Sequence, residues 1–256
     1  MTVSGFSRGR AIHFALCCVD TDVTGEANFT AADAVDLLAW KHAIFDLYAG
    51  IRASADPESA WRHWRATRDR MYRDHPQSPI PADARASFTG CAFLEYDPSW
   101  RTTAVVEDAA SDRRHLRAST GGAFSFTRVG IVRFTLQAVE HELELAWNDG
   151  YGGGIFLGFT DETSGTTTYG GGRYLIDTVK GADPGFDSEN GTVVLDFNFA
   201  FNPSCSYDAS WACPLAPPAN RLAVPVLVGE QHPLSSTNSA IDLRSPAPGS
   251  MRVSLD

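Results

Sequence analysis

The sequence predicts a mainly β protein: an antiparallel β-barrel or sandwich with two N-terminal α-helices packed against it. Short runs of alternating apolar and polar residues begin near Phe88 and are separated by turns rich in Gly, Asp and Pro. No long helical pattern separates these runs, which disfavours the crossover connections that parallel strands need. Helical spacing of apolar residues is instead found before residue 75.

The first helix is expected over residues 31–54, where apolar residues recur at intervals of three and four. The second begins with Asp56 as N-cap and Pro57 at the first helical position, both of which suit unpaired N–H groups at a helix start. Its stripe of two tryptophans predicts docking onto the sheet. Arg68 lies on the same stripe, so we expect it to have a carboxylate or carbonyl partner, or to reach over the rim of a pocket.

The strands and the domain organisation follow from the positions of the turns. We expect an irregular leader over 1–30, a single β-rich domain with the helices over 31–231, and an extended or mobile tail over 232–256. Strands are expected at 92–96, 102–107, 124–136, 142–147, 155–159, 173–178, 192–201 and 222–229.

Charge and composition exclude several classes of partner. The net charge of −10 argues against a nucleic acid or an anionic membrane, because either needs a basic surface. No apolar run approaches the roughly 20 residues that cross a bilayer. The apolar stretch 11–19 resembles a signal peptide, but it contains a histidine and runs into acidic residues without a cleavage site, so export is not expected.

The five cysteines do not form the even framework of a disulfide-rich secreted domain. Cytoplasmic residence is therefore predicted. Cys205 and Cys213 are separated by seven residues and could still approach each other as a pair. Burial as free thiols is the commoner arrangement. A zinc site would need a nearby histidine or a second pair, so we predict no metal and no cofactor.

The segment 191–213 carries the clearest alternation in the chain. In a strand, side chains of successive residues point to opposite faces, so its apolar and polar residues would separate. The polar face would be either a solvated surface or the wall of a polar pocket. The apolar set is Val193, Leu195, Phe197, Phe199 and Phe201, and the polar set is Asp196, Asn198 and Asn202.

A glycine-rich segment, 152–174, could leave backbone N–H groups free for an anion or a carbonyl oxygen. It lacks the spacing of a P-loop or a dinucleotide fingerprint, so nucleotide binding is not expected. Ser164 is favoured as a turn former over a nucleophile. Arg173 could pair with Asp161 or Asp196, either as a structural strut or as a donor array for a substrate carboxylate.

Several long motifs in one order resemble the domain of unknown function 1684 family. They are FLGFTDETSGTTTYGGGRYL (156–175), LDFNFAFNPSC (195–205), CPLAPPANRL (213–222), and the earlier WRATRD (64–69) and HPQSP (75–79). The chain departs from the expected pattern at Cys91, Gly158 and Phe201, where Gly, Pro and Tyr are expected. The resemblance implies that these residues belong to the family pattern: Asp161, Ser164, Tyr169, Arg173, Asp196, Asn198, Asn202, Cys205, Tyr207, Cys213 and Glu230.

These patterns together suggest an enzyme that acts on a small organic molecule in a polar pocket. Asp196 or Asp161 would be the general acid or base, in hydrolysis, isomerisation or cyclisation. A binding protein without turnover and a purely structural polar network remain alternatives, and neither the substrate nor the oligomeric state is predicted. The residues expected to bind the substrate are Arg173, Asn198, Asn202, Tyr169, Ser164 and Arg68.

Overall fold

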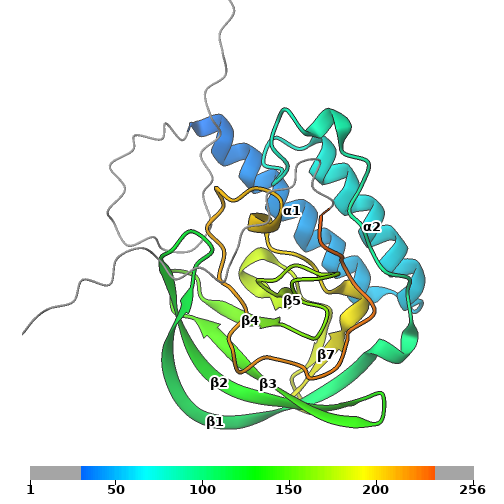
Figure 1. Cartoon of the computed structure of the whole chain (residues 1–256), viewed down its shortest axis with the longest axis vertical. Coiled ribbons are helices and arrows are strands. Elements are labelled where there is room, and N and C mark those ends of the chain that lie inside the picture. Colours follow the sequence, from blue (N-terminus) through cyan, green and yellow to red (C-terminus); the bar gives the residue numbers. More distant parts are fainter. Residues whose placement is uncertain (1–29, 234–256) are drawn as a thin grey trace, which may run out of the picture.

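The structure is a computed structural model that describes residues 30–233. Two helices, α1 (Ala31–Ala53) and α2 (Pro57–Asp74), precede the strands of the described chain (Figure 1). The predicted leader and tail lie almost entirely outside the described residues, as do Cys17 and Cys18. The strands are β1 (Arg101–Arg117), β2 (Ala123–Leu136), β3 (Val139–Asn148), β4 (Gly154–Phe159), β5 (Arg173–Asp177), β6 (Phe186–Asp187) and β7 (Thr192–Asp196).

Local capping explains where both helices begin. The Thr30 side chain accepts from the backbone N–H of Asp33, whose carboxylate accepts in return from the N–H of Thr30. Asp56 accepts from two backbone N–H groups in the first turn of α2, and Pro57 follows it. The predicted starts of both helices are therefore confirmed. Neither helix in residues 30–233 has the length and apolar character that a bilayer crossing requires.

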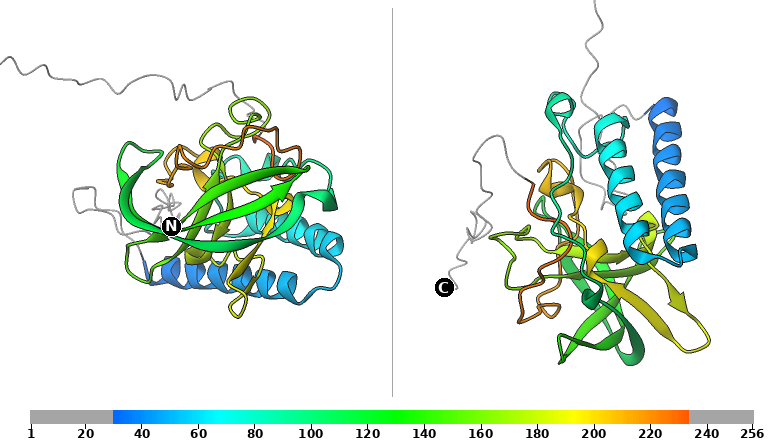
Figure 2. Two further views of the ribbon diagram at one scale, coloured as in Figure 1. Left: turned by 90° about the horizontal axis from the view of Figure 1, so that it is seen from below. Right: turned by 90° about the vertical axis from the view of Figure 1, so that its right-hand side faces the viewer.

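The strands form one antiparallel sheet in the order β5-β4-β3-β2-β1-β7-β6, which curls into a half-barrel (Figures 1 and 2). From β1 to β5 each strand pairs with the next along the chain. β7 then returns to pair with the other edge of β1, which places Asp196 opposite Arg101. The mainly β architecture with two packed N-terminal helices is thus confirmed.

β1 is longer than the predicted strand 102–107. Its second half is rich in charged residues, a composition that reads as solvated loop rather than strand. The strand continues to Arg117 because β2 pairs with it beyond a register shift between Asp108 and Asp112. Arg114 illustrates how the charges are accommodated, since it forms ion pairs with Asp112 in its own strand and Glu144 in β3.

The predictions of strands at 92–96 and 222–229 are wrong. The first segment contributes one bridge, between Phe93 and Glu230. The second alternates as expected, with Leu222, Val226 and Val228 buried, yet it joins no ladder. Its buried residues pack into the core cluster inside the curl, so its alternation reflects burial without strand pairing.

The predicted single strand over 192–201 is also wrong. β7 ends at Asp196, and a 3-10 turn, η4 (Phe197–Phe199), follows. The Asp196 carboxylate accepts from the backbone N–H of Asn198 at 3.1 Å, which stabilises a turn in place of further ladder pairing. The two faces expected for this segment do not separate beyond Asp196, and residues 195–202 are all buried.

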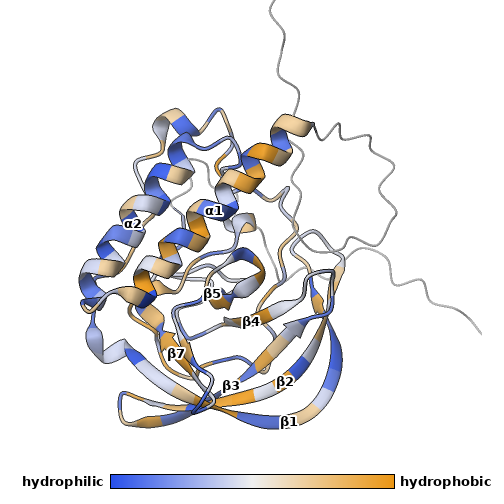
Figure 3. Ribbon diagram, turned by 180° about the vertical axis from the view of Figure 1, so that it is seen from behind, coloured by the Kyte–Doolittle hydropathy of each residue, from blue (hydrophilic) through white to orange (hydrophobic). Residues whose placement is uncertain are grey.

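Two apolar clusters make up most of the core. One lies inside the curl of the sheet and includes Leu195 and Phe197. The other lies between the helices and one end of the sheet (Figure 2) and includes Trp64 and Tyr174. Apolar residues also remain on the outer side of α1 (Figure 3). The apolar residues predicted to form one buried stripe on this helix therefore lie in two environments. Ile44, Leu47 and Tyr48 are buried, whereas Val35, Leu38 and Phe45 are exposed.

Replacement of Trp64 by alanine is expected to lower the free energy of unfolding by about 3–5 kcal/mol, because the ring is fully buried and leaves a cavity. The ring packs edge-on against Phe93 and Phe199, with centroids 5.3 and 5.2 Å away. Urea unfolding measures the loss. Trp147→Ala is the control, because Trp147 is 43% exposed on β3 and should cost much less. Equal losses in the two variants would contradict the proposed role of Trp64.

Candidate functional site

Arg173 and Asp161 form a buried ion pair at the start of β5. The Arg173 Nη2 atom donates to Asp161 Oδ2 at 2.6 Å, and both side chains are about 1% exposed. Nη1 also donates to the carbonyl of Val228 at 2.6 Å, and Nη2 to that of Val226 at 3.2 Å. The sequence allowed either Asp161 or Asp196 as the partner of Arg173. In the structure the partner is Asp161.

Both oxygens of Asp161 are occupied by protein donors. Oδ1 accepts from the backbone N–H and the hydroxyl of Thr163 at 2.8 and 2.6 Å, and Oδ2 also accepts from the N–H of Val226. Ser164 is part of the same turn, where its hydroxyl accepts from the N–H of Asp161 at 3.0 Å. Burial lowers the pKa of Arg173, and the Asp161 charge opposes that effect. Neither oxygen of Asp161 is without a protein donor, which suits a structural role for the ion pair.

A second buried pair joins α2 to the C-terminal segment. Arg68 Nη2 donates to Glu230 Oε2 at 3.0 Å and to the Tyr72 hydroxyl at 2.8 Å. Glu230 also accepts from the backbone N–H of Asn202 at 2.7 Å and from the Tyr207 hydroxyl. Burial raises the pKa of Glu230, and the positive charge of Arg68 opposes that effect. The carboxylate partner expected for Arg68 is therefore Glu230.

Asn198, Asn202 and Tyr169 lie at three different places. The Asn198 amide donates to the carbonyl of Asp97 and to Asp196 Oδ1, each at 2.9 Å. The Asn202 amide donates to the carbonyl of Gln231 at 2.7 Å. The Tyr169 hydroxyl lies 3.5 Å from the Cys205 sulfur. The predicted substrate-binding residues are thus not gathered around one cavity.

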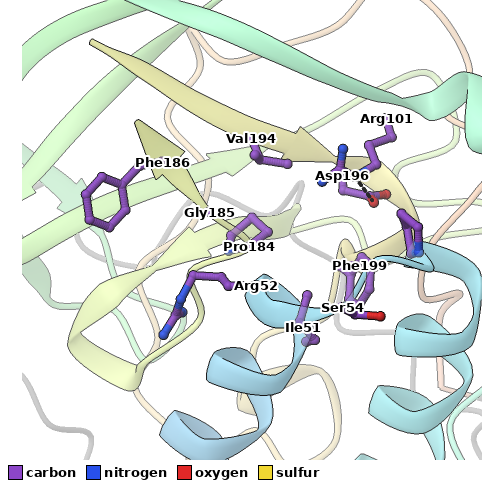
Figure 4. A pocket seen from close by; sticks show the side chains of 11 residues that line it. Ile51, Arg52, Ser54, Arg101, Pro184, Gly185, Phe186, Val194, Asp196 and Phe199 are labelled. Atoms are coloured by element: carbon purple, nitrogen blue, oxygen red, sulfur yellow. Dashed lines mark ion pairs between the residues drawn. The ribbon is translucent and has the colours of Figure 1, made fainter. Parts of the chain in front are cut away.

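Asp196 lines a cavity of about 270 Å³ between the end of α1, the start of β1 and β7 (Figure 4). The figure shows Asp196 beside Arg101 at one end of the cavity, with Phe186 toward the other. Of the eight predicted site residues, Asp196 alone is in the lining. The full lining is Ile51, Arg52, Ser54, Pro57, Arg101, Pro184, Gly185, Phe186, Val194, Asp196 and Phe199.

The two oxygens of the Asp196 carboxylate have different partners. Oδ1 accepts from the backbone N–H and the amide of Asn198. Oδ2 is buried and forms an ion pair with Arg101, whose Nε lies 3.2 Å away. The residue is 2% exposed, and burial raises the pKa of its carboxyl, with Asn198 and Arg101 opposing. A buried acceptor on a cavity wall is suited to exchange a proton with a bound molecule.

Two arginines of the cavity were missed by sequence reasoning. Arg101 lies opposite Asp196 in the β1–β7 register, and Arg52 lies in the last turn of α1, where it donates to the carbonyl of Asp183 at 2.8 Å. Both side chains are partly exposed, at 38% and 36%. Neither residue belongs to a motif, so only the strand register and the helix packing could have identified them. Among residues 30–233, no group of three or more His, Cys, Asp or Glu side chains is placed to hold a metal ion.

The protein is thus of the mainly β class: a curled antiparallel sheet with two N-terminal helices packed against it. Two buried ion pairs, Arg173–Asp161 and Arg68–Glu230, hold parts of this fold together. The chain belongs to the family described as "Protein of unknown function (DUF1684)", whose model matches residues 86–231. The resemblance to this family is therefore confirmed for the motifs within the matched range, while the motifs at 64–69 and 75–79 lie outside it.

Among solved structures, the chain is similar to the solution NMR structure of an uncharacterised protein from Haloarcula marismortui. The two share 28% sequence identity and a TM-score of 0.50, over 68% of this chain and 93% of that chain. No curated protein matches the chain. The comparisons therefore support the family and the fold.

Replacement of Arg173 by methionine is expected to lower the free energy of unfolding by about 3–5 kcal/mol, because it leaves the Asp161 charge buried and unpaired. A second substitution, Asp161→Asn, should recover part of this loss by removing that charge. Arg133→Met is the control, since Arg133 pairs with carboxylates on the exposed sheet surface and should change stability little. A loss as small as that of the control would show that the pair is not a strut.

Proposed function

We propose that the cavity beside Asp196 binds a small organic molecule with an anionic group, and that Asp196 acts on it as a general acid or base. The observation that carries this proposal is the position of Asp196, a buried carboxylate in the lining of a cavity whose Oδ2 atom is paired with Arg101 of the same lining. Arg52 and Arg101 supply positive charge in the same lining. A small carboxylate fits this combination, because arginine side chains recognise carboxylates by charge-assisted hydrogen bonds.

The raised pKa of Asp196 supports the acid/base role. A carboxyl group is most useful in proton transfer when its pKa lies closer to the working pH than that of a solvated aspartate. Burial shifts Asp196 in this direction. Asn198 holds Oδ1 from two donors, so Oδ2, beside Arg101, is the oxygen that remains for proton transfer. The reaction class that follows is proton transfer by a single carboxylate, as part of hydrolysis, isomerisation or cyclisation.

A binding protein without turnover is the second candidate. The observation that favours it is the position of Asp161, which is saturated by Arg173, Thr163 and Val226 and does not line the cavity. A two-carboxylate mechanism is thereby disfavoured, and the cavity has one ionisable acid. We also propose that the protein resides in the cytoplasm, which the free, buried Cys91, Cys205 and Cys213 support.

Small monocarboxylates, from acetate to benzoate, are expected to bind in this cavity, with amide NMR shifts centred on Ile51, Gly185 and Val194. Affinity should fall as the pH rises through the pKa of Asp196, because ionised Asp196 repels the anion. Arg101→Gln should weaken binding about tenfold, since it removes a charge-assisted contact. Asp196→Asn should bind the same probes with no such pH dependence. Shifts spread over the surface, or unchanged binding in Arg101→Gln, would contradict the proposal.

Turnover separates the two candidates. With a panel of small carboxylic esters, lactones and hydroxy acids, any activity found should fall about 100-fold or more in Asp196→Asn. Activity should rise with pH through the pKa of Asp196 if the carboxylate acts as the base, and fall if the carboxyl group acts as the acid. Asp187→Asn is the matched control, because Asp187 is an exposed carboxylate of the β6–β7 hairpin outside the cavity. Probe binding with the expected pH dependence but no turnover on the panel would favour the binding protein.

A further inference from the structure

Cys205, Cys213 and Tyr169 form a small buried cluster apart from the two main clusters of the core, with Trp211 packed against it. Cys205 lies in a 3-10 turn, η5 (Ser204–Ser206), and Cys213 follows a loop whose residues 209 and 210 are exposed. The two cysteines are 3% and 1% exposed, and both are free thiols. Neither residue lines the cavity beside Asp196, so this cluster is independent of the proposed function.

The fold brings the two thiols together from different supports. Cys213 is held by the β1–β2 turn, where its N–H donates to the Ser119 hydroxyl at 3.0 Å and its carbonyl accepts from the N–H of Ser119. Cys205 is held against the Tyr169 hydroxyl at 3.5 Å. Cys213 lies in the same buried cluster as Cys205 and Tyr169. The two thiols are therefore neighbours while both residues are reduced.

The surroundings shift the pKa values of the two thiols in opposite directions. The neighbouring Cys213 thiol, helped by Tyr169 and Ser119, lowers the pKa of Cys205 against the opposing effect of burial. The neighbouring Cys205 and burial raise the pKa of Cys213. These opposite directions favour Cys205 as the thiolate, the state in which a thiol reacts with electrophilic oxygen.

We propose that Cys205 and Cys213 form a redox-active dithiol, which a hydroperoxide oxidises to an intramolecular disulfide. The Cys205 thiolate attacks the terminal peroxide oxygen: an S–O bond forms, the O–O bond breaks, and the sulfur loses two electrons to the peroxide. The departing alkoxide or hydroxide takes up a proton from water and leaves as the alcohol or water. Cys213 then attacks the Cys205 sulfenic acid: the S–S bond forms, the S–O bond breaks, and the hydroxide leaves as water with the Cys213 proton. A dithiol reductant restores the pair by thiol–disulfide exchange.

Cys91 provides an internal comparison, because it is equally buried but has no cysteine beside it among the described residues. Its sulfur lies 3.3 Å from the Tyr207 hydroxyl. Burial and the nearby Glu230 charge raise its pKa well above the ordinary value. Cys91 should therefore remain a thiol under conditions that oxidise Cys205.

The test uses the full chain with Cys17→Ser and Cys18→Ser, so that three cysteines remain. The folded protein is treated with hydrogen peroxide at neutral pH, and thiols and disulfides are mapped by mass spectrometry of its peptides. We expect the mass to fall by two hydrogen atoms, a Cys205–Cys213 cross-link, and full reversal by dithiothreitol. Cys205 should be consumed at least about tenfold faster than Cys91, because of its larger thiolate fraction.

Two variants assign the roles without requiring the disulfide to form. Cys213→Ser should stop oxidation at a Cys205 sulfenic acid, which dimedone traps, whereas Cys205→Ser should leave Cys213 and Cys91 unmodified. Cys91→Ser should oxidise as the parent does. Three intact thiols after treatment of the folded parent protein, or oxidation of Cys91 at the rate of Cys205, would overturn the proposal.

Discussion

The C-terminal segment 222–230 must be held over an open sheet without strand pairing, and buried ion pairs do this. Arg173, held by Asp161, donates to the carbonyls of Val226 and Val228 on β5's side of the core. At the end of the segment, Glu230 pairs with Arg68 of α2. A buried charge is costly without its partner, so each pair allows one arrangement of the elements it joins. The two pairs thus link the segment to β5 at Arg173 and to α2 at Arg68.

The same constraint separates two kinds of buried carboxylate. The carboxylate oxygens of Asp161 and Glu230 accept hydrogen bonds from arginine, backbone N–H and hydroxyl donors of the protein. Asp196 accepts from Asn198 at Oδ1 and is paired with Arg101 at Oδ2. Burial alone does not mark a reactive acid, because all three side chains are nearly inaccessible. A position in the lining of a cavity distinguishes Asp196 from the other two.

Features set by nearby residues were predictable from the sequence, and features set by distant contacts were not. Both helices begin where the sequence predicts, α1 from its apolar spacing and α2 from its Asp56–Pro57 cap, because both signals act over a few residues. The alternation after Thr192 predicted a strand, but the Asp196 side chain bonds the backbone two residues on and ends it. Within the site, the position of Asp196 on a cavity wall required the return of β7 to β1. The contributions of Arg52 and Arg101 required that same long-range pairing and the packing of α1, which no local spacing encodes.

The segment 196–205 carries both Asp196, the acid of the proposed function, and Cys205, the nucleophile of the proposed dithiol. Between them, Asn202 is held through its backbone N–H by Glu230, which is itself paired with Arg68. Phe201, where the family pattern expects a tyrosine, packs its ring under the Arg68 guanidinium at 5.2 Å. Because breaking this ion pair would leave a charge unpaired in the core, we expect it to hold the chain between the two proposed sites in place.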